Sequence, residues 1–259
     1  MTSTEVRTSE RPTARAIPRR RLRVVLGIGL LFGLVIGTLL GLSLGPRAPA
    51  LGGAHRGDET LAAEVRAALG SDRGYQTLSV GRIRDGAVSF AGLGEEDGAV
   101  PTPQTRYELG SITKTFTGML LADAVSRKEM TVEDRLAQHL PELAGTPAGD
   151  LTLFELATHS SGLPSIPPDI TYGSLALALG NENPYQVSVE QVIEASRTVE
   201  LKKQGEYAYS NLGMSLLGHA EARAAGVPDW PTLATQRILQ PLGMTATTFA
   251  VTEADIPDG

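Results

Sequence analysis

An uncharged apolar run near the start of the chain decides how the rest can be arranged. Residues 24–44 read "VVLGIGLLFGLVIGTLLGLSL", which is 21 residues without a charge, directly after the basic segment "RRRLR". At about 1.5 Å per residue, a helix of this length spans the roughly 30 Å hydrocarbon core of a bilayer. Because basic residues stay on the cytoplasmic side, the pattern predicts a cytoplasmic Arg-rich tail at residues 1–23, a transmembrane anchor at residues 24–45, and export of the remainder.

Two alternatives accompany this prediction. The tripeptide "APA" at residues 48–50 resembles a cleavage site, although the apolar run exceeds the length of about 7–15 residues that is usual for a signal peptide. Glycines recur every four residues along the run, at positions 29, 33, 37, 41 and 45. Such a stripe would let two anchors pack closely in a homodimer, but glycine is also simply common in membrane helices.

The charge and the histidines of the exported part exclude several kinds of partner. The tail holds seven of the 23 basic residues and two of the 29 acidic ones, so the remainder has 16 basic and 27 acidic residues. Its net charge of −11 argues against nucleic acid as a partner. The chain has no cysteine, and its four histidines lie far apart, without the spacing of a metal site. We therefore expect no metal and no other cofactor.

Secondary-structure signals divide the exported part into a linker and a domain rich in helices. Residues 46–57, "PRAPALGGAHRG", have the composition of a linker. A helix follows at residues 58–70 with Gly70 as its stop, and two runs of strand formers at residues 75–92 then meet at Asp85-Gly86, a hairpin signal. After residue 110 the pattern is helical, with segments expected at 111–127, 132–139, 152–158, 189–196, 210–225 and 231–240.

This inventory predicts an α+β fold, which is a helical domain plus an antiparallel sheet of which only the amino-terminal hairpin is visible. An isolated two-stranded hairpin is marginal in water, so we expect further strands to pair with it. The whole of residues 58–259 is assigned to this domain.

The segment "ELGSITKTFTGMLL" at residues 108–121 places Ser111 and Lys114 three residues apart at the start of an apolar helix. Side chains at this spacing share a helix face, so the hydroxyl and the amine can meet. Ser111 would then be a nucleophile and Lys114 its proton acceptor, provided that apolar neighbours desolvate the ammonium, as catalytic lysines require. The neighbours expected to do so are Ile112, Phe116, Met119 and Leu120. The alternative is structural, with Ser111 as a helix cap and Lys114 as a solvated side chain.

A second polar group, formed by Tyr209, Ser210 and Asn211, precedes the helical run that begins near residue 212. A phenol flanked by cationic groups can hold its proton loosely and shuttle it. Tyr209 is therefore a candidate general base or acid, and the Asn211 amide is a candidate ligand of a substrate carbonyl or of Lys114. The alternative is that the group caps the helix.

Four segments, in this order and spacing, resemble the serine β-lactamase and penicillin-binding-protein superfamily. They are "ELGSITKTFTGMLL", "LATHSSGLP" at residues 156–164, "YAYSNLGMSLLG" at 207–218 and "PLGMTATTF" at 241–249. The likeness runs from about residue 60 to residue 259. It is to the class C-like branch, which also holds D-alanyl-D-alanine carboxypeptidases and carboxylester hydrolases.

The resemblance implies a β-lactamase/transpeptidase-like fold and a role for each candidate residue. These roles are acylated nucleophile for Ser111, proton acceptor for Lys114, general base or acid for Tyr209 and substrate-orienting amide for Asn211. His159 would be a structural member of its segment, shaping the loop behind the site.

The sequence departs from the pattern of this superfamily at its end. Members carry a later motif, Lys or His, any residue, then Gly, on a strand that supplies a second oxyanion donor, and nothing after Tyr209 matches it. The strands that pair with the hairpin would also follow this point. Because loss of one oxyanion donor costs about 2.7–4 kcal/mol of transition-state stabilisation, we expect the 259 residues to be a truncated product, inactive or barely folded alone.

Functions of different classes fit the exported position of this domain. The first is a membrane-anchored serine hydrolase that attacks an amide or ester in a small molecule or peptidoglycan peptide: a β-lactam, a D-Ala peptide or a carboxylester. The second is a receptor that binds a penicillin or cell-wall ligand, or is acylated by it, and does not turn it over or does so slowly. A structural anchor with a decayed site is a third alternative.

Overall fold

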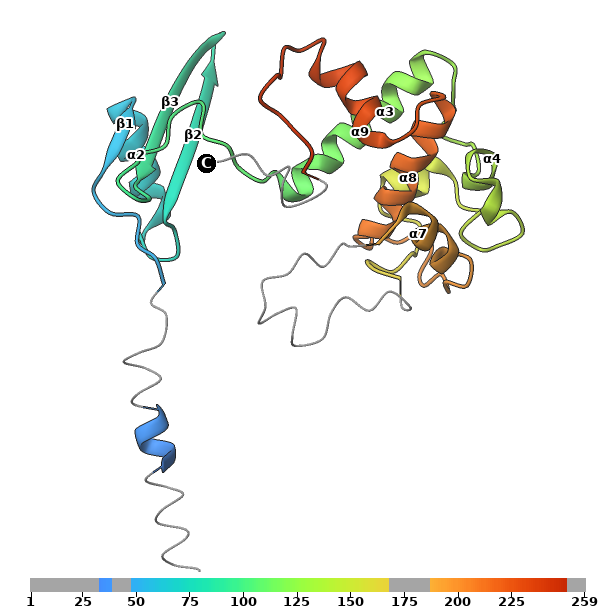
Figure 1. The fold of residues 1–259 in the computed structure, drawn as a ribbon, viewed down its shortest axis with the longest axis horizontal. Coiled ribbons are helices and arrows are strands. Elements are labelled where there is room, and N and C mark those ends of the chain that lie inside the picture. The colour runs from blue at the N-terminus through green and yellow to red at the C-terminus, as the bar shows by residue number, and fades with distance from the viewer. Residues whose placement is uncertain (1–32, 39–47, 168–186, 251–259) are drawn as a thin grey trace, which may run out of the picture. The chain divides into compact units, whose positions relative to one another are not determined.

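The structure is a computed structural model that describes residues 33–38, 48–167 and 187–250. The chain forms two compact units, Met1–Thr105 and Arg106–Gly259, each with its own hydrophobic core (Figure 1). The predicted anchor at residues 24–45 lies mostly outside the described residues, apart from a short helix at residues 33–38. Within the described ranges, no helix is both long enough and apolar enough to span a bilayer.

The first unit is a three-stranded antiparallel sheet with a helix. Its elements are β1 (His55–Gly57), α2 (Glu59–Leu69), β2 (Thr77–Arg84) and β3 (Ala87–Gly94), and the strand order is β1-β3-β2. Helix α2 begins after Asp58, whose side chain caps the amide of Leu61. It ends at Gly70, which has a left-handed backbone with φ of 64°, as predicted. The helix contacts β3 and shares a core with the buried Leu93 of that strand.

The predicted hairpin is present, with its turn at Asp85 and Gly86. Both residues have a positive φ, 51° and 78°, which is the backbone of the tight turns that join two adjacent strands. The register pairs Arg84 with Ala87 beside the turn. The turn residues thus set the alignment of β2 on β3.

The prediction of a linker through residue 57 is wrong for its last part, because residues 55–57 form β1 on the edge of β3. The same stretch contributes to the core, since Leu51 has only 1% of its surface exposed. The Arg66 guanidinium of α2 donates to the carbonyl oxygens of Gly52 and Ala54 and holds this segment in place. Backbone pairing of this kind leaves no trace in a composition of Pro, Gly and Ala, and it gives the hairpin a third strand.

The second unit is built of short helices around α8. Its elements are η1 (Gly110–Ile112), α3 (Thr113–Ser126), α4 (Leu136–His139), η2 (Pro141–Leu143), α5 (Leu153–Ala157), α7 (Val189–Ser196), α8 (Asn211–Ala224), α9 (Trp230–Ala234) and η3 (Thr235–Leu239). Helix α8 contacts α3, α4, α5, α7 and α9 (Figure 1). Its side chains Leu216, Leu217 and Ala220 have no exposed surface, so this helix forms the centre of the core.

Polar caps explain why two of these helices occur where the sequence predicts them. Thr152 and Glu155 form a capping box at the start of α5, in which each side chain bonds the backbone of the other residue. Ser188 and Gln191 do the same at α7. Both pairs follow the pattern Ser or Thr, two residues, then Glu or Gln, which is readable in a sequence.

Two predicted helices differ from the structure. The helix expected at 132–139 begins only at Leu136, because Asp134 accepts hydrogen bonds from the amide (3.0 Å) and the hydroxyl (2.6 Å) of Thr131 and holds those residues in a turn. The helix expected at 231–240 is divided into α9 and the π-helical turn η3.

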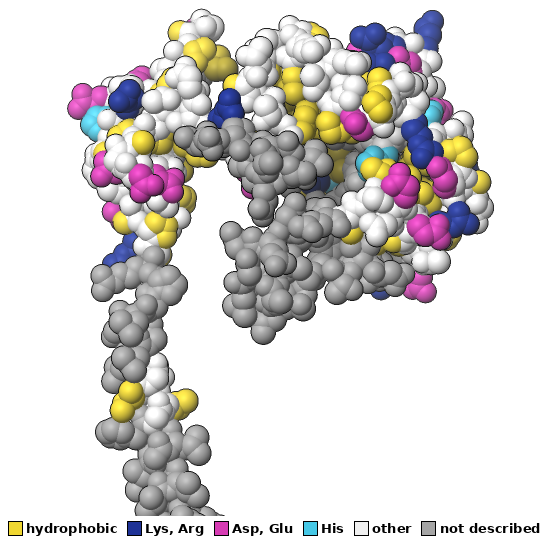
Figure 2. Space-filling view, viewed as in Figure 1, with side chains coloured by type: hydrophobic (Ala, Val, Ile, Leu, Met, Phe, Trp, Pro, Cys, Tyr) yellow, Lys and Arg dark blue, Asp and Glu magenta, His cyan; other side chains and the backbone are white. Residues whose placement is uncertain are grey.

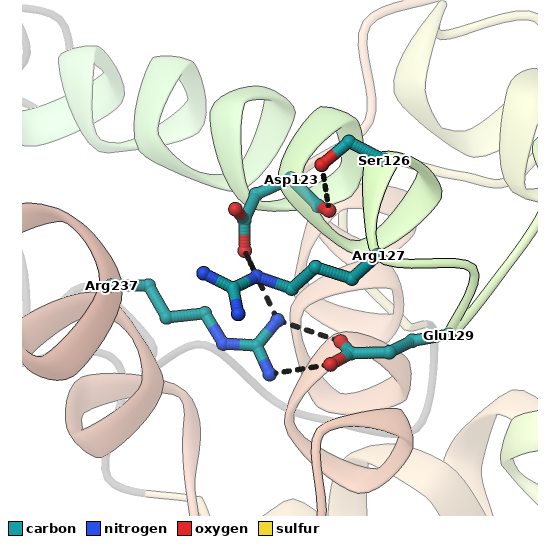
Figure 3. A network of polar contacts seen from close by, with 5 residues as sticks. All are labelled: Asp123, Ser126, Arg127, Glu129 and Arg237. Atoms are coloured by element: carbon teal, nitrogen blue, oxygen red, sulfur yellow. Dashed lines mark hydrogen bonds and ion pairs between the residues drawn. The ribbon is translucent and has the colours of Figure 1, made fainter.

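An ion-pair network joins α3 and the residues after it to η3 (Figure 3). The Arg237 guanidinium donates to both carboxylate oxygens of Glu129, at 2.6 and 2.9 Å, and to Asp123 at 3.1 Å. Arg127 donates to the same aspartate at 2.7 Å. The Arg237 side chain is only 14% exposed, so its two-pronged contact stabilises more than an ion pair in open solvent. On the face shown in Figure 2, acidic and basic side chains of this unit lie interspersed, with hydrophobic side chains between them.

Helix α8 also buries a carboxyl group. Glu221 is 1% exposed, and among the described residues neither of its oxygens has a hydrogen-bond partner. The indole nitrogen of the neighbouring Trp230 likewise lacks one. Burial raises the pKa of Glu221 to about 9, an effect that the nearby indole N–H opposes in part. The carboxyl group is therefore neutral at pH 7 in the folded protein.

Candidate active site

Ser111 and Lys114 lie on consecutive turns at the start of α3. Gly110 has a positive φ of 50° and leads into the 3-10 turn η1, which contains Ser111, and α3 begins at Thr113. In a 3-10 turn, side chains three residues apart eclipse one another. The Lys114 amine accordingly donates to the Ser111 hydroxyl oxygen at 3.2 Å. The helical region thus starts close to the predicted residue 111, with a tighter first turn.

Tyr209 joins this pair from the segment that precedes α8. Its phenol oxygen lies 2.7 Å from the Ser111 hydroxyl oxygen, across 98 positions of sequence. The Lys114 nitrogen lies 4.9 Å from the centre of the Tyr209 ring. The structure therefore brings together the three side chains that the sequence predicts as catalytic, with the serine oxygen between the amine and the phenol.

Contacts with Lys114 and Ser111 change the acidity of the phenol. The interaction with the Lys114 ammonium, and after it the hydrogen bond with Ser111, hold the pKa of Tyr209 below its ordinary value. Burial acts in the opposite direction but does not cancel these two contacts. A phenolate at this position is stabilised by the cation beside it.

The apolar shell expected around Lys114 is not formed. Ile112 and Met119 are 59% and 48% exposed. Phe116 and Leu120 pack instead into a separate cluster with residues of α9 and η3. The reason is geometric, because Lys114 is two residues before Phe116 and so projects from nearly the opposite face of the helix. The amine is placed to act on the phenol and the hydroxyl rather than to sit in an apolar pocket.

The loop at residues 159–165 holds the segment that carries Tyr209. Backbone amides of that segment donate to carbonyl oxygens of the loop at three points, each at 2.8 Å: Lys202 to Gly162, Gly205 to Ser160 and Ala208 to His159. Gly162 has a φ of 74°, and a Cβ there would lie 2.8 Å from the Lys202 carbonyl oxygen, so only glycine fits. The approach of the two segments positions the phenol.

Ser210 and Asn211 contact the loop rather than the nucleophile. The Ser210 hydroxyl donates to the Pro164 carbonyl oxygen at 2.8 Å and accepts from the Gly213 amide at 2.9 Å, which makes it the buried N-cap of α8. The Asn211 amide nitrogen donates to the Ser165 hydroxyl at 3.4 Å, and in the described part of the chain no hydrogen bond joins it to the predicted lysine partner. The capping alternative thus applies to Ser210, and the substrate-binding role of Asn211 stays a prediction.

Metal-ligating side chains do not converge in the described part of this unit. In the described ranges, no three His, Asp or Glu side chains are placed to hold an ion. The histidine of the loop, His159, contacts the rings of Tyr207 and Tyr209 and the backbone amide of Ser210.

Comparison with known protein families shows to which family the chain belongs. A model of the beta-lactamase family matches residues 60–258, which include Ser111, Lys114 and Tyr209. The chain belongs to the beta-lactamase family. The resemblance carried by the four sequence segments is confirmed by this match.

Two beta-lactamases illustrate how much of the family the chain covers. That of Escherichia coli strain K12 is 33% identical over 155 residues, which are 60% of this chain and 37% of that protein. That of Pseudomonas fluorescens is 30% identical over 182 residues, which are 69% of this chain and 47% of that protein. The chain therefore matches less than half the length of either beta-lactamase.

Solved structures of the family share the fold. A class C beta-lactamase from Rhodobacter sphaeroides superposes with a TM-score of 0.60 and 28% identity, over 78% of this chain and 57% of that one. The D-alanine carboxypeptidase AmpC from Burkholderia cenocepacia superposes with a TM-score of 0.56 and 27% identity, over 70% of this chain and 47% of that one. The predicted β-lactamase/transpeptidase-like α+β fold with a small antiparallel sheet is confirmed.

The sequence pattern of the beta-lactamase family does not predict every contact of the site. Pro164 and Ser165 hold the start of α8, yet the sequence gives them only as part of a loop rich in glycine and proline. The one available signal was the serine at position 210, a residue type favoured as an N-cap before a helical run.

Proposed function

We propose that this beta-lactamase family member is a serine hydrolase that cleaves an amide or ester bond through an acyl-enzyme on Ser111. The observation that carries the proposal is the position of the Ser111 hydroxyl oxygen, 3.2 Å from the Lys114 nitrogen and 2.7 Å from the Tyr209 oxygen. A serine becomes a nucleophile at neutral pH only when a base adjoins it. Here a base of lowered pKa lies at hydrogen-bond distance.

In the proposed reaction, the Ser111 oxygen attacks the carbonyl carbon while its proton passes to Tyr209, whose phenolate form Lys114 stabilises. The tetrahedral intermediate then expels the amine or alcohol, which takes that proton. In the second half, water attacks the acyl-enzyme and gives a proton to Tyr209, and the Ser111 oxygen leaves with it. Tyr209 thus acts as base and acid in turn, while Lys114 acts through its charge and its hydrogen bond to the nucleophile.

The start of α3 contributes to the stabilisation of the oxyanion. Ser111 lies in the 3-10 turn that leads into this helix, at the positive end of the helix dipole. One oxyanion donor is worth about 2.7–4 kcal/mol in the transition state, whereas enzymes lower barriers by at least about 8 kcal/mol. The proton relay and a further donor have to supply the rest.

The proposed substrates are a β-lactam, a D-Ala peptide of peptidoglycan or a carboxylester. Relatives described as beta-lactamases and as a D-alanine carboxypeptidase support the first two. The exported position predicted from the sequence would give the site access to each of the three.

The test is covalent labelling of the nucleophile with two probes, a fluorescent penicillin and a fluorophosphonate. Wild type should be labelled, and Ser111→Ala should not. Ser126→Ala is the matched control, because this serine is exposed on the same helix and donates to the backbone oxygen of Asp123, away from the site. Equal labelling of Ser111→Ala and wild type would refute the proposed nucleophile. Labelling by the fluorophosphonate alone would keep Ser111 as the nucleophile, and an assay for hydrolysed penicillin would then separate fast release of the acyl group from a site that does not accept the β-lactam.

The lifetime of the label separates a hydrolase from a receptor. A hydrolase should release the penicilloyl group and regain free Ser111, whereas a penicillin or cell-wall receptor would keep it. Mass spectrometry of the protein over time after a single addition of penicillin measures this directly.

We also propose that residues 24–45 anchor the chain in the membrane, with residues 1–23 in the cytoplasm and the hydrolase domain outside. The support is the uncharged run behind a basic segment, and its glycine stripe would let two anchors pair. A chain tagged at its amino terminus should stay in carbonate-washed membranes, and external protease should remove the domain but spare the tag. Recovery of a soluble domain that starts near residue 51 would favour the cleaved signal peptide instead.

A further inference from the structure

We propose that His159 is a positioning residue that holds Tyr209 against the nucleophile, and that it does so only while its imidazole is neutral. The inference rests on the proposed function, because it concerns the phenol that receives the Ser111 proton. The site would then have a built-in response to acid in addition to its proton relay.

His159 contacts Tyr209 and also the residues directly before and after it in the chain. The His159 carbonyl oxygen accepts the amide of Ala208 at 2.8 Å, and its Nδ1 atom accepts the amide of Ser210 at 3.2 Å. Between these two bonds, the imidazole lies against the Tyr209 ring, with the ring centres 4.7 Å apart and the planes tilted by 38°. One residue therefore fixes the backbone before and after the phenol and one face of its ring.

The bond from Ser210 depends on the protonation state of the imidazole. An amide N–H can donate only to an Nδ1 that carries no proton, so the neutral form present here has its proton on Nε2. Protonation of Nδ1 would place two donors face to face. It would also put a second positive charge near Lys114, which already acts on this ring.

The surroundings of His159 favour the neutral form. Burial, and after it the charge of Lys114 on α3, lower the pKa of His159 below its ordinary value of 6.5. Among the described residues, the other titratable groups in contact with the ring are Tyr207, whose ring is edge-on at 5.9 Å, and Tyr209, both from the segment before α8. The contact to Ser210 is therefore intact at neutral pH and is lost in acid.

Two variants separate the hydrogen-bond acceptor from the ring. His159 has a φ of 56°, a left-handed backbone that asparagine tolerates well. His159→Asn places a carbonyl oxygen where Nδ1 was, so it keeps the acceptor but cannot titrate. His159→Phe keeps a ring against Tyr209 but has no acceptor.

The measurement is the rate of fluorophosphonate labelling of Ser111 between pH 4.5 and pH 8. The labelling rate of wild type should fall about tenfold or more as the pH is lowered, with a midpoint below pH 6.5. The rate of His159→Asn should not show this fall. His159→Phe should be slower at pH 7, by about 10 to 100-fold, because a displaced base is an inefficient one. The same acid midpoint in wild type and His159→Asn would overturn the inference, as would full activity of His159→Phe.

A second readout distinguishes failure of this inference from failure of the proposed function. In nitrogen-15 NMR of the whole chain, the His159 ring should show the Nε2–H tautomer at pH 7, and the Ser210 amide signal should move with the imidazole titration. If neither probe labels Ser111, the proposed hydrolase function is wrong. The movement of the Ser210 amide signal with the His159 titration then still tests whether Nδ1 of His159 accepts this amide. A Ser210 amide that ignores the titration would refute it.

Discussion

Replacement of Glu221 by glutamine should stabilise the second unit by an amount that depends on pH. The folded state keeps a proton on this carboxyl group up to a pH of about 9, whereas an ordinary glutamate releases it near 4.5. Between these values the folded state binds more protons than the unfolded state, so stability falls as pH rises. At about 1.4 kcal/mol per pH unit, the penalty is about 3 kcal/mol at pH 7 and levels off at about 6 kcal/mol above pH 9. Glutamine has nearly the same shape and does not titrate, so it removes this penalty.

The chain is suited to this measurement because its single tryptophan, Trp230, lies beside Glu221. Urea unfolding followed by Trp230 fluorescence should give a clearly higher midpoint for Glu221→Gln at pH 7 and nearly equal midpoints near pH 4.5. Glu200→Gln, at an exposed position of the same unit, is the matched control and should show no such trend. A stability difference between Glu221→Gln and wild type that stays constant from pH 5 to pH 9 would refute the assignment of a neutral buried acid.

Three further substitutions test the site and its support. Tyr209→Phe keeps the ring but removes the proton acceptor, so the rate of penicillin labelling should fall by about 10² to 10⁴ with an unchanged circular dichroism spectrum; an unchanged rate would contradict the relay. Arg237→Ala removes the guanidinium that holds the partly buried Glu129 and leaves Asp123 with Arg127 alone among the described residues, so it should cost about 1–3 kcal/mol in urea unfolding; an unaltered midpoint would show that the network is dispensable. Gly92→Ala puts a Cβ within 2.1 Å of the Pro101 carbonyl oxygen and should destabilise the sheet unit by about 1–3 kcal/mol. Gly81→Ala, where nothing lies within 4 Å, is its control, and equal hydrogen-exchange protection of the sheet in both variants would contradict the clash.

The elements that could be predicted are those that are specified by a few residues close together in the sequence. Asp85 and Gly86 specify their turn through their own backbone preferences, and the capping box at Ser188 marks the start of α7. Strand β1 could not be predicted in this way. Its three residues are exposed and are held by backbone bonds to a strand more than 30 positions later, so no side-chain pattern marks them.

The same distinction applies to the site and explains why the prediction of an apolar shell around Lys114 was wrong. The spacing of Ser111 and Lys114 is local, and their contact follows from one helical turn. Tyr209 was a candidate on its residue type, but only the family resemblance linked it to a serine 98 positions earlier. The side chains that surround the Lys114 amine depend on which face of α3 packs against α9. The packing of the whole unit determines that face. Phe116 and Leu120 are turned away from Lys114 into the cluster with α9 and η3, so the predicted apolar shell around the amine does not form. In the proposed relay the proton passes instead to Tyr209, whose phenolate that amine stabilises, so the proposal gives the residues that fix this phenol, foremost His159, a direct influence on the rate of the reaction.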